Sequence, residues 1–199
     1  MHAFRSVLAG VPLLLGLATA APAQHPQVRD GFWVGFGVGF GEAGVSCNSC
    51  VSASDGSGVS IYFKIGGTLS HKVLLGGEIN ALSTSSSLGI PSSGNPETVL
   101  GNLSAAVYYY PAVSAGFFLK GGAGFSSITE SGGALTLDGT GWGLLAGVGY
   151  DLRVGRNVSL TPVMNFYFGD PGNLTSGNAT VITGTSQRVF DIGLGVTFH

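Results

Sequence analysis

The chain has few charged residues and, after its first two dozen residues, no long apolar run. Only 9% of its 199 residues are charged, against about a quarter in average soluble domains. The scarcity of charge argues against an ordinary soluble enzyme, and the 44% apolar content argues against a disordered chain. Because no run of about 18 apolar residues is present there, no helix is expected to span a bilayer. Apolar composition without continuous apolar runs is typical of a transmembrane β-barrel.

The first 23 residues are expected to be a secretory signal peptide that is removed from the mature protein. A weakly basic start and an apolar stretch precede Ala21-Pro22-Ala23, which offers a cleavage site. Residues 24–30 would then be a short leader, and residues 31–199 would form the barrel domain. A retained membrane anchor is the alternative, which the shortness of the apolar stretch disfavours.

Glycine is over-represented, with 35 copies, and it alternates with large apolar residues in GFWVGFGVGF, residues 31–40. A β-strand sends alternate side chains to opposite faces. One face of this stretch therefore carries Phe and Val, whereas the other face, after Trp33, carries only glycine. We expect the bulky face to point into lipid and the glycines to point into a narrow lumen.

Seven further stretches show the same two-residue period, so the sequence predicts eight strands. They span residues 31–40, 58–66, 72–82, 99–110, 115–125, 141–151, 157–168 and 189–198. About ten residues is the length that a tilted strand needs to cross the hydrocarbon layer. Connections after even-numbered strands are short, and the other four are long and polar. The predicted fold is all-β, an eight-stranded antiparallel transmembrane β-barrel with short periplasmic turns and four long extracellular loops.

The end of the chain, DIGLGVTFH, has the pattern polar, any, Gly, any, any, apolar, any, apolar at Asp191, Gly193, Val196 and Phe198. With this ending, the chain resembles the small eight-stranded outer-membrane β-barrels of the OmpA/OmpX type over essentially its whole mature length. The resemblance implies that these four residues are an assembly signal for the barrel-assembly machinery, which recognises the last strand in that family. The family usually ends in Phe, whereas His199 follows here. The resemblance also implies a bacterial outer-membrane location, with outer-membrane lipid around the barrel.

Four charged residues point into the predicted lumen: Lys64, Glu78, Lys120 and Asp191. A charge in a low-dielectric interior must be paired or hydrated. The balanced signs favour a charge network that holds the barrel closed, and a narrow charge-lined path for small solutes is the alternative. An eight-stranded lumen is just wide enough for side chains to fill. The aromatic residues expected to fill much of it are Trp33, Tyr62, Tyr108, Tyr110 and Tyr167.

The predicted loops are acidic, and the predicted turns are mostly basic. The loop carboxylates are Glu42, Asp55, Glu97, Glu130, Asp138 and Asp170, and the turn charges are Lys72, Asp151, Arg153 and Arg156. An acidic outer face attracts divalent cations, but the solubility of exposed loops explains the same composition. Cys47 and Cys50 are expected to form a disulfide, because two nearby cysteines in a secreted protein usually pair.

The sequence shows no catalytic constellation, metal site or cofactor motif. No carboxylate lies near His71 in the sequence to activate it, two cysteines are too few for a soft-metal site, and no basic stripe suggests nucleic acid. We therefore expect a non-catalytic outer-membrane protein with a structural or surface-interaction role through its acidic and polar loops. Its extracellular partner is not identifiable from the sequence. The alternatives are a narrow small-solute pore, a lipid-modifying barrel enzyme and a soluble lipocalin-like carrier.

Overall fold

The computed structural model describes residues 29–48, 54–85, 96–132, 135–177 and 179–199. The strands are β1 Phe32–Ser46, β2 Ser54–Ser70, β3 Val73–Thr84, β4 Glu97–Tyr109, β5 Phe117–Gly132, β6 Leu135–Tyr150, β7 Leu152–Arg153, β8 Val158–Ser176 and β9 Ala179–Phe198. The part of the chain that the structure describes contains no helix able to cross a bilayer. The predicted signal peptide lies outside the described residues, as does the leader before Arg29.

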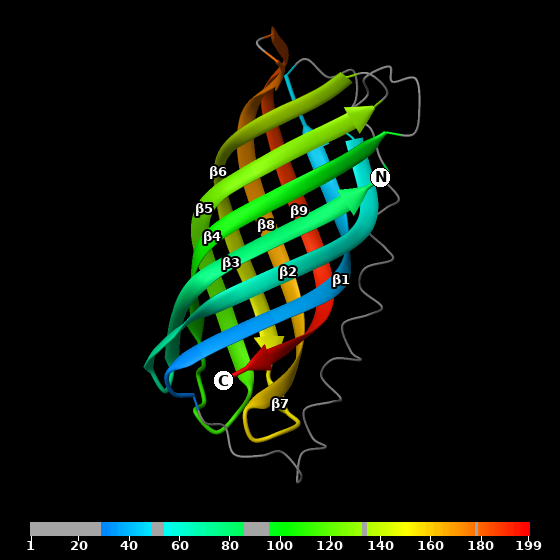
Figure 1. Cartoon of the computed structure of the whole chain (residues 1–199). Helices are drawn as coiled ribbons and strands as arrows, with labels where there is room; N and C mark the ends of the chain where they lie inside the picture. Colours follow the sequence, from blue (N-terminus) through cyan, green and yellow to red (C-terminus); the bar gives the residue numbers. More distant parts are fainter. Residues whose placement is uncertain (1–28, 49–53, 86–95, 133–134, 178) are drawn as a thin grey trace, which may run out of the picture.

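Eight of the strands close into an antiparallel ring, which confirms the predicted fold class (Figure 1). The ring runs from β1 through β6 to β8 and β9, and β9 pairs back onto β1 along a seam that aligns Gly37 with Gly195. The two-residue β7 follows β6 and pairs with the start of β8. Closure gives the backbone groups of each long strand partners on both sides, as a membrane interior requires.

The strands extend further than predicted at the end opposite the short turns. β5 and β6 stay paired as far as Gly132 and Leu135, and β8 and β9 stay paired as far as Ser176 and Ala179. The β8–β9 hairpin rises above the rest of the barrel in Figure 1. Two of the four long connections are thus mostly strand, because their Ser, Thr and Asp residues alternate with apolar ones. We call this end the outer end and the short-turn end the periplasmic end.

Side chains alternate between the lumen and the outer surface along the long strands. Phe36, Val38 and Phe40 are 51–62% exposed, whereas Trp33 is 3% exposed, so the facing predicted for β1 is confirmed. Aromatic residues frame the outward apolar surface in two belts, as they do at the interfaces of outer-membrane barrels. The periplasmic belt contains Phe32, Tyr109, Phe117, Tyr150 and Phe198, and the outer belt contains Phe40, Phe125, Trp142, Phe168 and Phe190.

Beyond the outer belt the alternation continues with its polarity reversed. The outward side chains there include Glu42, Asp55, Glu97 and Asp138, and all four are exposed. Most inward side chains there are apolar, and Thr84, Thr98, Glu130 and Thr185 are also inward and buried. We call the buried apolar set the apolar layer: Ala43, Val45, Leu82, Leu100, Ile128, Leu137, Leu174, Ile182 and Val189. The outer end therefore packs like a water-soluble β-barrel around its own core.

The inward glycines provide the space that the large lumen side chains occupy. A Cβ atom on Gly37 would lie 2.6 Å from the Tyr62 ring and 2.7 Å from the Cα atom of Gly195. A Cβ atom on Gly35 would lie 2.6 Å from Cε of Lys64. In β1, glycine thus faces the crowded lumen, and the bulky residues that alternate with it face outward.

Phe36→Arg tests the outward assignment, because Phe36 is exposed and lies midway along β1 between Phe32 of the periplasmic belt and Phe40 of the outer belt. An arginine near the bilayer midplane should lower the free energy of unfolding by about 2–4 kcal/mol. Urea titration of the protein refolded in lipid vesicles measures this change. Glu42→Arg, on the same face of β1 but beyond the outer belt, should change stability far less. Equal stability of the two variants would contradict the assignment.

Candidate functional site in the barrel lumen

A buried ion pair lies in the middle of the lumen. Nζ of Lys120, on β5, lies 2.5 Å from Oε1 of Glu78, on β3, and both side chains are at most 1% exposed. The hydroxyl of Tyr108, on β4, donates to the other oxygen of Glu78. Glu78, Tyr108 and Lys120 lie on β3, β4 and β5, so one carboxylate joins three neighbouring strands. A buried charge held in this way is both paired and hydrogen-bonded, which a low-dielectric interior requires.

Of the other two predicted lumen charges, Lys64 lies on β2 opposite Glu78 in the strand register, and Asp191 lies on β9. Asp191 is buried and accepts a hydrogen bond of 2.8 Å from the Asn165 side-chain amide. The Lys64 ammonium is surrounded by ring faces, 5.2 Å from the centroid of Phe118 and 5.6 Å from that of Tyr108. Among the described residues, no carboxylate oxygen lies within 4.0 Å of it. Cation–π attraction therefore replaces an ion pair at Lys64.

A second buried carboxylate, Asp151, closes the periplasmic end. Its oxygens accept hydrogen bonds from the hydroxyls of Tyr110, at 2.7 Å, and Thr161, at 2.9 Å. Thr161 in turn lies 2.9 Å from the hydroxyl of Thr197. The sequence reading placed Asp151 among the turn charges, but the side chain is fully buried. Its place directly after the outward Tyr150 on a period-two strand was the signal that it points inward.

Arg29 of the leader covers the same end of the lumen. Its guanidinium lies 3.7 Å from the centroid of the Tyr110 ring. Its two terminal nitrogens donate to the carbonyl oxygens of Val113, at 3.0 Å, and Ala115, at 2.5 Å. Arg29 thus connects the chain just before β1 to the turn between β4 and β5. No motif around Arg29 predicts this role from the sequence.

The last residue of the chain turns into the lumen instead of facing lipid. Nε2 of His199 lies 3.1 Å from the Ser159 hydroxyl and 3.9 Å from Oδ2 of Asp151. This is not the geometry of a Ser-His-Asp triad, in which the serine and the carboxylate contact different ring nitrogens. Burial lowers the pKa of His199 to about 4, so the imidazole is neutral at physiological pH.

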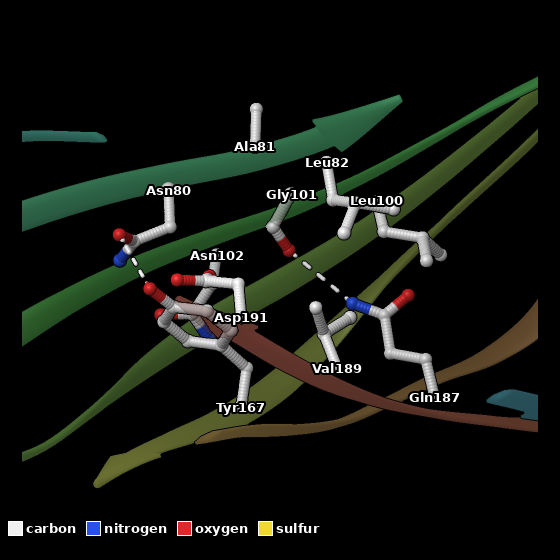
Figure 2. A pocket seen from close by; sticks show the side chains of 10 residues that line it. All are labelled: Asn80, Ala81, Leu82, Leu100, Gly101, Asn102, Tyr167, Gln187, Val189 and Asp191. Carbon is white, nitrogen blue, oxygen red and sulfur yellow. Dashed lines mark hydrogen bonds between the residues drawn. The ribbon is translucent and has the colours of Figure 1, made fainter. Parts of the chain in front are cut away.

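The outer half of the lumen holds the apolar layer and, beneath it, a small cavity lined by both polar and apolar side chains (Figure 2). Gln187 reaches across the barrel from β9 and donates a 3.3 Å hydrogen bond to the Gly101 carbonyl of β4. The cavity below has a volume of about 10 Å³. Its walls carry Asn80, Asn102, Tyr167 and Asp191, and Tyr167 donates to the Asn80 carbonyl at 2.7 Å. A space of this size holds about one water molecule.

The remaining predicted site residues lie on different parts of the barrel. Asp191 and Gly193 face the lumen, whereas Val196 and Phe198 lie on the outward row of β9, so the predicted assembly signal includes both faces. Cys47 follows β1, but Cys50 lies outside the described residues, so the disulfide stays a prediction. Within the described ranges, no three His, Cys, Asp or Glu side chains gather to hold a metal.

The loop carboxylates differ from expectation in one case. Glu130 was expected in an exposed loop, but it lies on the inward row of β5 and is 3% exposed. Glu42, Asp55, Glu97 and Asp138 are exposed, and Asp170 is half-buried. The outer surface of the barrel is therefore acidic even though most of these residues lie on strands.

A comparison with known protein families gives a match that covers the whole barrel. The family described as outer membrane protein beta-barrel domain matches residues 9–198. The chain belongs to this family. It is accordingly an integral β-barrel of the bacterial outer membrane. A comparison with curated proteins finds no match.

Solved outer-membrane barrels have similar folds. Neisserial surface protein A aligns with a TM-score of 0.52 at 17% identity, over 85% of this chain and 97% of that one. Ail, the attachment invasion locus protein of Yersinia pestis, has a TM-score of 0.49 at 12% identity, over 85% and 100% of the two chains. OprG from Pseudomonas aeruginosa has a TM-score of 0.49 at 14% identity, over 88% and 100%. At such identities the likeness extends to the fold alone.

Lys120→Met should lower the free energy of unfolding of this outer-membrane barrel by about 3–5 kcal/mol, because it leaves the Glu78 carboxylate buried without its cation. The double variant Glu78→Gln/Lys120→Met should recover most of that loss, because neither charge remains. Urea titration in lipid vesicles measures both. If the effects of Lys120→Met alone and Glu78→Gln alone add up to the effect of the double variant, the pair is not coupled in the folded protein.

His199 should make the barrel less stable in acid. Its folded pKa of about 4 lies below the unfolded value, so between about pH 6.5 and pH 4 the unfolded chain binds a proton that the folded one does not. Stability should therefore fall over this window by about 2–3 kcal/mol. His199→Gln should flatten that part of the pH profile, measured by urea titration at a series of pH values. An unchanged slope would show that the imidazole is not buried as described.

Proposed function

We propose that the protein is a closed, non-catalytic barrel whose lumen gives rigidity and whose exposed outer end makes its contacts with the surroundings. The observation that carries the proposal is the filling of the lumen at three levels. The apolar layer fills the outer end, the Glu78–Lys120 pair with Tyr108 fills the middle, and the Asp151 cluster with Arg29 fills the periplasmic end. A transport path would have to pass all three.

The shape of the outer end supports a role in contact. Paired strands continue beyond the outer aromatic belt and enclose the apolar layer, so the exposed surface is held by packed β-structure. Its outward side chains are mostly polar, and the charged ones in the described part of the chain are acidic except for Arg188. A rigid surface with a defined charge suits recognition, because little conformational entropy is lost when a partner binds.

A narrow pore is the second candidate function. It is favoured by the polar cavity between the ion pair and the apolar layer, where Asn80, Asn102 and Asp191 line the lumen. Side chains of this kind line the paths of small polar solutes. The apolar layer would have to move for a solute to reach this cavity from outside.

Conductance across a planar bilayer separates the two candidates. Residues 24–199 would be refolded, and folding would be checked by the mobility difference between unboiled and boiled samples. The closed barrel should insert and stay silent, and so should Lys64→Ala/Lys120→Ala if other side chains still fill the lumen. Lys72→Ala, an exposed residue of a periplasmic turn, is the control. Reproducible conductance steps that change with the lumen lysines but not with Lys72 would overturn the closed barrel and establish the pore.

A further inference from the structure

Six buried polar atoms without a hydrogen-bond partner lie along the middle and outer parts of the lumen. Within the described ranges they are Oη of Tyr62, Nδ2 of Asn80, Nδ2 of Asn102, Oδ1 of Asn165, Oγ1 of Thr185 and Oε1 of Gln187. Native proteins leave few such atoms, and a cluster of them indicates a hydrogen-bonding ligand that the side chains themselves do not provide. Each of the six residues is at least nine-tenths buried.

Three of these residues line the cavity shown in Figure 2, beside Asp191. Asn80 and Asn102 bring amide groups to its wall from β3 and β4, and Gln187 brings its side-chain amide from β9. Leu82, Leu100 and Val189 of the apolar layer line the rest. The cavity is therefore polar on the side of the ion pair and apolar on the side of the outer end.

The mixture of groups limits what the cavity can bind. An anion would meet the Asp191 carboxylate, and a metal cation would meet the amide N–H groups of Asn80 and Asn102. A larger solute does not fit a volume of about 10 Å³. The ligand must therefore be small, and it must both donate and accept hydrogen bonds.

We propose that the cavity is a binding site for a single water molecule, which accepts from the Asn80 and Asn102 amides and donates to Asp191 and to Oε1 of Gln187. Two to four polar partners are typical of a buried water. The bound water links β3 and β4 to β9 across the lumen, where, within the described part of the chain, Asp191 bonds to Asn165 and Asn80 to Tyr167 rather than to each other. It is held between the Glu78–Lys120 pair and the apolar layer, so it exchanges slowly with bulk water.

Magnetisation transfer from water to the side-chain amides of Asn80 and Asn102 tests the proposal in the full barrel, labelled with ¹⁵N and embedded in lipid nanodiscs. We expect cross-peaks at both amides with the sign of a long-lived bound water, which separates them from proton exchange. Gln187→Leu removes one partner and should abolish these cross-peaks. Ser159→Ala, a buried residue at the periplasmic end, should leave them unchanged. Missing cross-peaks in the wild-type protein, or cross-peaks that persist in Gln187→Leu, would overturn the proposal.

Xenon provides a second measurement that does not depend on any variant. Xenon binds a dry apolar cavity that is large enough to admit it. The proposal requires that xenon causes no shift of the Leu82, Leu100 and Val189 methyl resonances in the wild-type barrel, because the cavity holds one water molecule and has no room for a larger atom. Saturable shifts at these methyl groups would show that the cavity is dry and would contradict the bound water, whatever the outcome of the conductance measurement.

Discussion

The width of an eight-stranded lumen is the constraint on which the rest of the structure depends. Such a barrel has room for side chains but not for a large side chain from every strand. Tyr62 and Lys64 fit because Gly37, Gly195 and Gly35 leave space opposite or beside them. The same width forces charged groups into contact with one another. Buried charges in the lumen must therefore pair, as Glu78 and Lys120 do. The inward glycines and the buried ion pair thus both follow from the narrow width of the lumen.

The same strands are surrounded by lipid along one part of their length and by water along another. Between the aromatic belts lipid surrounds the strands, so apolar residues such as Val38 face outward and polar ones face the lumen. Beyond the outer belt water surrounds the same strands, so Glu42 faces outward and Val45 faces inward. The two-residue period does not change at this boundary, only the assignment of polar residues to faces. The apolar layer is therefore a consequence of extending the strands into water, and it closes the lumen at the same time.

The facing of the strands could be predicted from the sequence, because period-two alternation depends only on local backbone geometry. The contacts inside the lumen could not, because which inward residues meet depends on the stagger between strands that are distant in the sequence. Glu78 and Lys120 are 42 residues apart, and nothing local distinguishes Lys120 from Lys64 as the partner. The sequence predicts polar loops around Ile128 and Leu174, because serine, threonine and glycine are typical of loops as well as of strands in water, whereas both residues lie on strands.

The two ends of the lumen are closed by interactions that make different demands on the chain. The apolar layer requires only that apolar side chains of sufficient volume fill the space, so one apolar residue can replace another of similar volume without opening the lumen. The Asp151 carboxylate instead needs Tyr110 after β4, Thr161 on β8 and the neighbouring His199 at the chain end, with Arg29 stacked on the ring of Tyr110. His199 follows β9 and Arg29 precedes β1, and these are the two strands that pair to close the ring. The Asp151 cluster therefore gathers both strands of the closing seam at one end of the lumen, and the periplasmic seal is complete only when β9 has paired with β1.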